Sequence, residues 1–220
     1  MTSFPEEIIQ RLSQCRVVAG FSVNSAEHAV LIAKALLAGG IGAIELTLRT
    51  PAAMDGLRAI CKEVPDMLIG AGTILTPETV AEVKKIGAHF GVSPGMNPRV
   101  IHAAQKADLP FAPGICTPTE LESAIELDCR FVKFFPAEPS GGLKYLRSMA
   151  APYKHLNIQY FPLGGLNAEN MIDYLKDPAI PAIGGSWIVT KELVDNRNWE
   201  GITSRASEVI QAMRKGLTNE

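Results

Sequence analysis

Short apolar runs alternate with amphipathic stretches along the whole chain, in a rhythm of about 25 residues. Each apolar run has the length of a buried strand and is followed by a turn rich in Gly, Pro or Thr. This rhythm is typical of βα units, in which parallel strands alternate with helices. The pattern predicts eight strands, over residues 17–23, 43–47, 67–71, 89–93, 110–112, 130–134, 158–162 and 180–184.

The stretches between these strands carry the signals that start helices. Ser25, Thr76 and Thr117 are good N-cap residues, and proline follows two of them at the first helical position. The pattern predicts helices over residues 26–38, 52–62, 77–86, 98–106 and 118–127, with an extra helix over 5–14 before the first strand and a last helix over 199–215.

Eight alternating βα units without a linker predict one domain over residues 1–220, folded as a single (β/α)8 TIM barrel with an extra N-terminal helix. An open doubly wound sheet is the alternative. Its nucleotide fingerprint is G-x-G-x-x-G, and Gly70-Ala71-Gly72 lacks the third glycine.

Composition and charge argue against several classes of function for this protein. The formal net charge of −2 provides no basic field for nucleic acid, and no apolar run approaches the roughly 18 residues of a membrane span. The acidic N-terminal segment does not resemble a signal peptide, so we expect a cytoplasmic protein. The four cysteines and four histidines do not have the spacing of metal ligands, and we expect no metal and no cofactor.

The second strand ends in a polar alternation. Glu45, Thr47 and Arg49 fall on one face, and Ile44 and Leu46 fall on the other. The apolar face suits packing against helices, so the polar face is expected to point into the barrel. Such groups are costly inside a barrel unless they pair with each other or with a ligand. A purely structural ion pair between Glu45 and Arg49 is an equally good interpretation.

The sixth strand carries a lysine among apolar neighbours. Lys133 lies between Val132 and Phe134, with Phe131 and Phe135 on its own face. Burial of a lysine disfavours its charged form and leaves an amine that can attack a carbonyl to give a Schiff base. The alternative is an edge-strand lysine in solvent, but a closed barrel has no edges. Glu45 is the candidate proton shuttle.

Glycine pairs follow the last two strands, where barrels of this type commonly bind phosphate. We expect phosphate contacts from Gly164, Gly165, Gly184, Gly185 and Ser186. Ends of other strands supply further candidates. Thr73 could donate its hydroxyl to a substrate carboxylate beside Arg49, and Pro94 and Phe135 are expected to shape the pocket wall. Plain turns are the alternative for each of these segments taken singly.

Taken together, these residues resemble the 2-keto-3-deoxy-6-phosphogluconate (KDPG) and 4-hydroxy-2-oxoglutarate (KHG) aldolase family, from about residue 17 to residue 213. The order and spacing of six segments carry the resemblance: residues 45–50, 70–73, 93–95, 113–114, 133–137 and 184–187.

The resemblance implies a metal-free class I aldolase that assembles as a homotrimer. It implies cleavage of 2-dehydro-3-deoxy-6-phosphogluconate to pyruvate and glyceraldehyde 3-phosphate, and of 4-hydroxy-2-oxoglutarate to pyruvate and glyoxylate. By resemblance, Lys133 is the Schiff-base lysine and Glu45 the general acid/base. Arg49 and Thr73 hold the pyruvate-derived carboxylate, and the two glycine loops bind phosphate.

Two departures from the family pattern bear on the substrate. Leu163 stands where relatives commonly have threonine, which removes a hydroxyl from a position that faces the substrate. The first strand reads Ala19-Gly20-Phe21 in place of the usual Pro-Val-Ile or Pro-Val-Leu, so the pocket floor is expected to differ. The C4-epimeric phosphogalactonate is therefore an alternative substrate.

Other activities stay open on sequence alone. An oxaloacetate decarboxylase would use the same Schiff base without a shuttle for a C4 hydroxyl, so its activity would survive Glu45→Gln. A sugar-phosphate-binding protein that kept the barrel would leave Lys133 inert to borohydride trapping. A metal-dependent aldolase would need a ligand set at the strand ends, and the sequence does not offer one.

Overall fold

The structure is a computed structural model, and it describes residues 4–218. Within that range the strands pair in parallel and form two sheets. One sheet has six strands in the order β5-β4-β3-β2-β1-β9, and the other has three in the order β6-β7-β8. The strands are β1 (Val17–Phe21), β2 (Ala43–Thr47), β3 (Leu68–Gly72), β4 (Phe90–Val92), β5 (Phe111–Ala112), β6 (Gly114–Ile115), β7 (Phe131–Phe134), β8 (Gln159–Pro162) and β9 (Ile183–Gly185).

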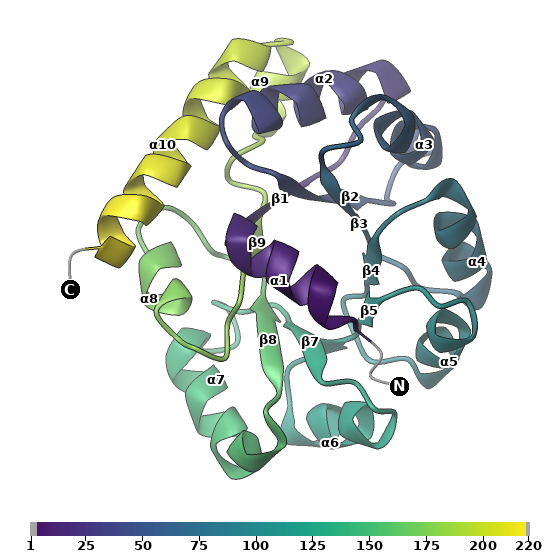
Figure 1. The fold of residues 1–220 in the computed structure, drawn as a ribbon, viewed down its shortest axis with the longest axis vertical. Helices are drawn as coiled ribbons and strands as arrows, with labels where there is room; N and C mark the ends of the chain where they lie inside the picture. The colour runs from purple at the N-terminus through teal and green to yellow at the C-terminus, as the bar shows by residue number, and fades with distance from the viewer. Residues whose placement is uncertain (1–3, 219–220) are drawn as a thin grey trace.

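The helices surround the strands, and one of them lies across the strands at one end (Figure 1). That exception is α1 (Glu6–Cys15). The surrounding elements are α2 (Ala26–Ala38), α3 (Ala53–Glu63), α4 (Pro77–Ile86), α5 (Pro98–Lys106), α6 (Pro118–Glu126), α7 (Gly142–Ala150), the 3-10 helix η1 (Ala151–Leu156), α8 (Met171–Leu175), α9 (Lys191–Asp195) and α10 (Trp199–Thr218).

The predicted α/β fold with parallel strands is confirmed, but the strands do not form one continuous eight-stranded sheet. The predicted fifth strand, 110–112, corresponds to β5, and Pro113 separates it from the short strand β6, which the pattern does not predict. Proline has no N–H to donate to a neighbouring strand. The carbonyl of Pro113 still accepts from the N–H of Lys133 at 2.9 Å. At the other junction, a single parallel bridge joins Leu163, after β8, to Gly184 of β9.

The N-terminal caps form as the sequence predicts. The hydroxyl of Ser25 accepts from the N–H of His28 at 3.1 Å. Thr117 and Glu120 form a reciprocal capping box at the start of α6. Each such cap contributes about 1 kcal/mol, so the turns between strands and helices hold the strand ends in fixed positions.

The apolar core has two parts. A larger cluster fills the layer between the strands and the surrounding helices. A smaller cluster lies inside the strands, where the ring of Phe4 is 4.4 Å from that of Phe131 and 6.1 Å from that of Phe90. Ile9 and Leu12 of α1 belong to this inner cluster, so α1 closes that end of the interior.

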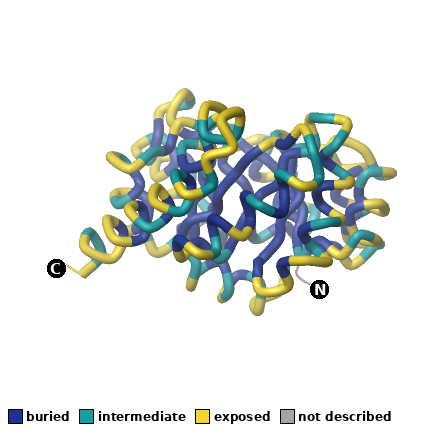
Figure 2. The backbone as a smooth tube through the Cα atoms, turned by 90° about the horizontal axis from the view of Figure 1, so that it is seen from above, coloured by how far each residue is buried: buried dark blue, intermediate teal, exposed yellow. Residues whose placement is uncertain are grey.

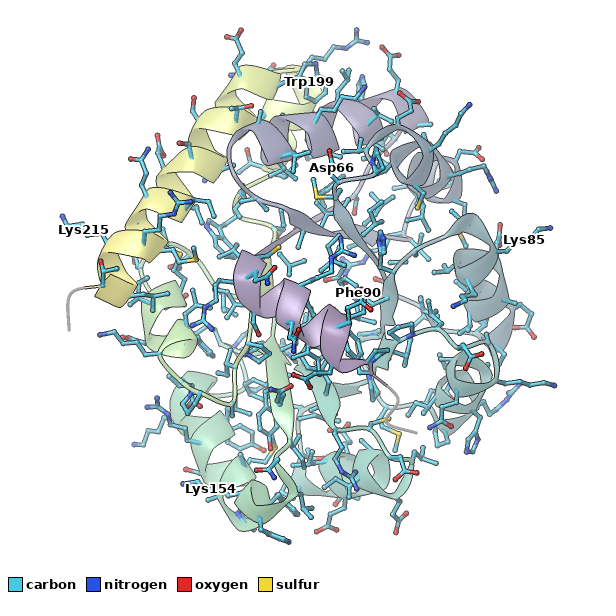
Figure 3. The ribbon with its side chains drawn as sticks, in the orientation of Figure 1. Asp66, Lys85, Phe90, Lys154, Trp199 and Lys215 are labelled. Atoms are coloured by element: carbon cyan, nitrogen blue, oxygen red, sulfur yellow. The ribbon has the colours of Figure 1, made fainter. Side chains whose placement is uncertain are left out.

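Burial follows this arrangement along the backbone. The strands are buried almost throughout, and the exposed positions gather on the outer helices and loops (Figure 2). Phe90 points into the centre, whereas Lys85 and Lys215 point outward (Figure 3). None of the helices within residues 4–218 combines the length and the apolar character that a membrane crossing requires.

Candidate active site

A cavity of about 780 Å³ opens at the carboxyl ends of β1, β2, β7, β8 and β9. This is the end of parallel strands at which α/β proteins generally bind their ligands. Eight of the eleven candidate site residues line it: Glu45, Arg49, Lys133, Phe135, Gly164, Gly165, Gly185 and Ser186.

The lysine and the glutamate meet inside this cavity. The Nζ of Lys133 lies 3.2 Å from Oε1 of Glu45. The residues are only 4% and 2% exposed. They come from β7 and β2, which belong to different sheets, and side-chain alternation points both inward. The aromatic ring of Phe135 lies 5.1 Å from the same Nζ and covers the amine on one side.

The glycines of β3 explain how the Glu45 carboxylate fits. A Cβ at Gly72 would lie 1.8 Å from Oε1 of Glu45, and a Cβ at Gly70 would lie 2.2 Å from the ring of Phe90. Only glycine leaves room for both side chains. On the other side of Glu45, a Cβ at Gly20 would make only ordinary van der Waals contacts, at 3.7 Å from Gly185 and 4.0 Å from Oε2 of Glu45. The Gly-Ala-Gly segment therefore makes a recess for the carboxylate.

Arg49 and Thr73 lie together at the rim. The Nε of Arg49 donates to Oγ1 of Thr73 at 3.0 Å. Thr73 has φ +64°, which is strained for a β-branched residue. The strained backbone aims the threonine hydroxyl at the arginine. The guanidinium is exposed and its remaining N–H groups are available to a carboxylate.

The loop after β8 brings backbone into the cavity. Gly164 and Gly165 have φ +96° and +85°, a conformation that favours glycine. A Cβ at Gly164 would lie 3.2 Å from the ring of Phe135, and one at Gly165 would lie 2.5 Å from Glu138. Leu163 precedes this loop and also lines the cavity. The loop therefore packs closely on the segment that follows Lys133.

The loop after β9 faces the first one. The indole of Trp187 packs against the backbone of Gly185, and a Cβ at Gly185 would lie 2.2 Å from the indole ring. Among the described residues, the indole Nε1 of Trp187 is a buried side-chain polar atom without a hydrogen-bond partner. The exposed Ser186 lies between them and lines the cavity. The packing of Trp187 on Gly185 thus fixes the loop from which the hydroxyl of Ser186 faces the cavity.

Three candidate residues lie outside the cavity lining. Thr73 reaches the site only through Arg49. Gly184 is buried within β9, where a Cβ would lie 2.8 Å from the side chain of Leu163, so its missing side chain leaves room for the leucine. The carbonyl oxygen of Pro94 packs 2.2 Å from the position that a Cβ at Gly114 would take. Pro94 thus contacts the neighbouring strand and not the cavity.

Other residues of the wall carry no clear signal in the sequence. The hydroxyls of Ser22 and Thr47 contact each other, and Thr47 also donates to the carbonyl of Phe21 at 3.1 Å. The alternation on β2 predicts that Thr47 points inward, but no pattern indicates Ser22. Helix α9 borders the mouth with the ion pair Lys191–Asp195. A five-residue helix leaves no periodic signal to detect.

The site is thus that of an α/β enzyme with a buried amine beside a carboxylate. In the described residues, no three His, Cys, Asp or Glu side chains gather as a metal-holding group. Residues 8–205 match the model of the KDPG and KHG aldolase family. The chain therefore belongs to the KDPG and KHG aldolase family.

Individual relatives agree over nearly the full length. The chain is 38% identical to the 2-dehydro-3-deoxy-phosphogluconate aldolase of Haemophilus influenzae, over 97% of this chain and 100% of that protein. It is 41% identical to the KHG/KDPG aldolase of Escherichia coli K12, over 90% and 92%. The solved KDPG aldolase of Legionella pneumophila, with pyruvate captured as a covalent carbinolamine intermediate, has a TM-score of 0.87 and 36% identity, over 92% of this chain and 97% of that one.

Proposed function

We propose that this protein is a class I aldolase that cleaves 2-dehydro-3-deoxy-6-phosphogluconate to pyruvate and glyceraldehyde 3-phosphate. The observation that carries the proposal is the buried contact between Lys133 and Glu45 at the carboxyl ends of parallel strands. The covalent pyruvate intermediate captured in the Legionella pneumophila enzyme supports the same chemistry here.

The reaction begins at Lys133. Transfer of a proton from Nζ to Glu45 leaves a free amine, which attacks the C2 carbonyl to give a carbinolamine. Glu45 then returns its proton to the carbinolamine hydroxyl, which leaves as water, so that an iminium forms and Glu45 is a carboxylate again. Glu45, acting through a water, then takes the proton of the C4 hydroxyl. The C3–C4 bond breaks, its electron pair moves into the iminium to give an enamine, and the aldehyde forms. Protonation of C3 and hydrolysis of the iminium release pyruvate and restore the amine.

The rest of the cavity suits the two ends of this substrate. The pair of Arg49 and Thr73 offers N–H and O–H donors to the carboxylate next to C2. Gly164, Gly165, Gly185 and Ser186 offer backbone N–H groups and a hydroxyl to the phosphate. The substrate then extends from Lys133 past Leu163 to the two loops.

A second substrate, 4-hydroxy-2-oxoglutarate, is favoured by the Escherichia coli relative, which is named for both activities. The apolar Leu163 also lines the middle of the cavity, and a leucine cannot hydrogen-bond a C4 hydroxyl. The C4-epimeric phosphogalactonate is therefore worth assaying beside the gluconate. Ser186→Ala should raise KM for the phosphorylated substrates about tenfold and leave that for 4-hydroxy-2-oxoglutarate unchanged.

Two junctions relate the six-stranded sheet to the three-stranded sheet. We infer one domain in which the two sheets form a single (β/α)8 barrel, with β5 and β6 as one strand interrupted at Pro113. The bridge between Leu163 and Gly184 supports closure on the other side. The homotrimer stays an expectation from the family resemblance, and the cytoplasmic location stays a prediction from the sequence.

Borohydride trapping with pyruvate tests the mechanism. Intact-mass and peptide mass spectrometry should find a reduced pyruvyl adduct on Lys133, and Lys133→Arg should prevent it. Lys144, an exposed lysine of α7, provides the matched control, since Lys144→Arg should be labelled like the wild type. Folded protein that gives no adduct would overturn the Schiff-base mechanism and favour a sugar-phosphate-binding protein.

A further inference from the structure

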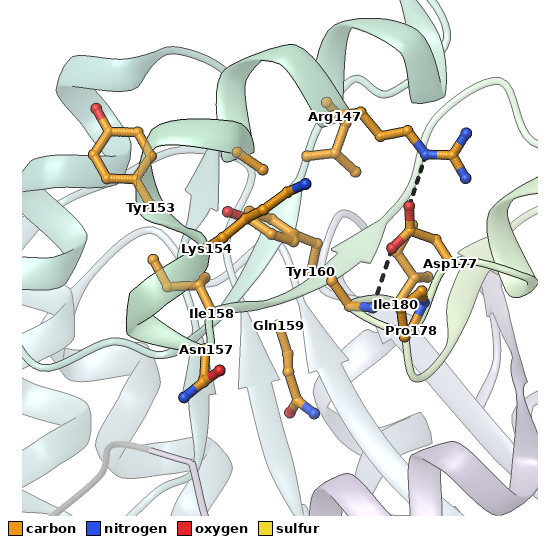
Figure 4. A pocket seen from close by; sticks show the side chains of 13 residues that line it. Arg147, Tyr153, Lys154, Asn157, Ile158, Gln159, Tyr160, Asp177, Pro178 and Ile180 are labelled. Atoms are coloured by element: carbon orange, nitrogen blue, oxygen red, sulfur yellow. Dashed lines mark hydrogen bonds and ion pairs between the residues drawn. The ribbon is translucent and has the colours of Figure 1, made fainter.

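A second cavity, of about 600 Å³, lies away from the active site. It is bounded by α7, by η1, by the start of β8 and by the segment that leads to β9 (Figure 4). The active cavity lies at the other end of these strands, and the two cavities share none of their lining residues. Its volume falls in the range of about 300–1,000 Å³ that is typical of small-molecule sites.

The floor of this cavity holds a phenol without a partner. Tyr160 is 3% exposed, and its hydroxyl makes no hydrogen bond within residues 4–218. Burial of the ring, with the charge of nearby groups, raises the pKa of Tyr160 to about 12, so the hydroxyl keeps its proton at neutral pH. The hydroxyl oxygen is not one of the fully buried unpaired atoms of residues 4–218, so it is reached from the cavity that Tyr160 lines. This hydroxyl is therefore a donor that a ligand would satisfy.

The charged groups around the cavity leave one cation in excess. Arg147 donates to Asp177 at 2.8 Å, and the other carboxylate oxygen of Asp177 accepts from the N–H of Ala179 at 3.1 Å. In Figure 4 this ion pair lies on one side of the cavity, and Tyr153 lies on the other. Lys154 has neither a hydrogen bond nor an ion pair for its ammonium in the described part of the chain. The groups without partners are thus two donors, one of them charged.

Apolar side chains make up much of the remaining wall. Leu146, Ile158 and Ile180 are buried and present their side chains to the cavity. A ligand that satisfies all these features has an apolar body and one anionic acceptor. We propose that this cavity binds a small carboxylic acid with an apolar body, whose carboxylate contacts Lys154 and Tyr160.

Methyl NMR with 3-phenylpropanoate as the probe tests this site on the full chain. The methyl signals of Ile158 and Ile180 report on this cavity, and those of Leu163 and Leu166 report on the active cavity. We expect saturable shifts at Ile158 and Ile180. Tyr160→Phe and Lys154→Gln should each weaken binding about tenfold, because each removes a hydrogen bond to a charged group.

Two matched controls separate this site from non-specific binding. Lys144→Gln removes an exposed lysine outside the cavity and should leave the affinity unchanged. The neutral amide 3-phenylpropanamide should bind about tenfold more weakly than the acid. The proposal is overturned by shifts confined to Leu163 and Leu166, by an affinity that survives both substitutions, or by no shift at Ile158 and Ile180 up to the solubility limit of the probe.

Discussion

The ammonium nitrogen of Lys133 and a carboxylate oxygen of Glu45 are 3.2 Å apart, although the two residues are 88 positions apart in the chain. Two buried groups of opposite charge stabilise each other, and removal of either one leaves the other as a buried charge without a partner. The pair is therefore as much a constraint on folding as an arrangement for catalysis.

This constraint predicts a non-additive effect on stability. Lys133→Met should lower the free energy of unfolding by about 3–5 kcal/mol, since it leaves the glutamate buried without its partner. Lys133→Met combined with Glu45→Gln should recover most of that loss. Denaturant unfolding of the two single variants and the double variant measures the coupling. Simple addition of the two single effects would show that the pair does not interact.

The role proposed for Glu45 predicts a separation of activities. Glu45→Gln should lower kcat for aldol cleavage about 10²–10⁴-fold, because the C4 hydroxyl loses its proton acceptor. Loss of CO₂ from oxaloacetate shares the activation of Lys133 by Glu45 but has no C4 hydroxyl to deprotonate, so its rate should fall less. Both rates are measured on the same preparation by coupled assay of pyruvate. Equal losses in the two reactions would contradict the proposed role.

The recess around the carboxylate predicts an effect from one methyl group. Gly72→Ala would place a Cβ 1.8 Å from Oε1 of Glu45, so the carboxylate must move away from Lys133. A displacement of that size should lower kcat by about 10². Gly20→Ala is the matched control, because its Cβ would meet no atom closer than 3.7 Å. Steady-state kinetics of the two variants should therefore differ, and similar values would refute this explanation of Gly72.

The half-buried imidazole of His89 predicts a dependence of stability on pH. His89 accepts from the N–H of Ile69 at 3.0 Å through Nδ1, and burial, aided by the charge of Arg11, lowers its pKa from the ordinary 6.5. The unfolded chain therefore binds a proton more readily than the folded one. The contribution of His89 is fully present above pH 6.5 and is lost as the pH falls below it.

Thermal unfolding across this window checks the expectation. Between pH 7 and pH 5 the stability of the wild type should fall more steeply than that of His89→Gln. The exposed His102 offers a control, since His102→Gln should keep the wild-type slope. Parallel curves for His89→Gln and the wild type would contradict the prediction.

Much of the site could be predicted because strand alternation and caps are local signals. Alternation alone places Glu45 on the inner face of β2, and the predicted bounds of β2, α2 and α4 agree with the structure. The short helix α9 could not be predicted, because five residues are too few to show a period. Helix α7 is absent from the predicted helices because Gly141 is its N-cap and Gly142 its first residue, and such a glycine pair is typical of a turn.

The packing reasons for the glycines were also beyond the sequence. Gly70 and Gly72 look like an incomplete nucleotide motif, but they make room for Phe90 and Glu45, which lie on other strands. Such contacts depend on which strands become neighbours. The interruption at Pro113 likewise depends on a contact between strands, because the carbonyl of Pro113 accepts from the N–H of Lys133 on β7.

Helix α1, with Phe4, Ile9 and Leu12 packed into the inner cluster, seals one end of the interior. The active cavity has no lining residue from α1 and lies at the carboxyl ends of the strands, so we expect substrate and products to pass through that end. In the proposed reaction, the fragment nearer the mouth blocks the one attached to Lys133. The aldehyde must depart first and pyruvate second, so the kinetics should show ordered release, with pyruvate competing against the intact substrate for the free enzyme.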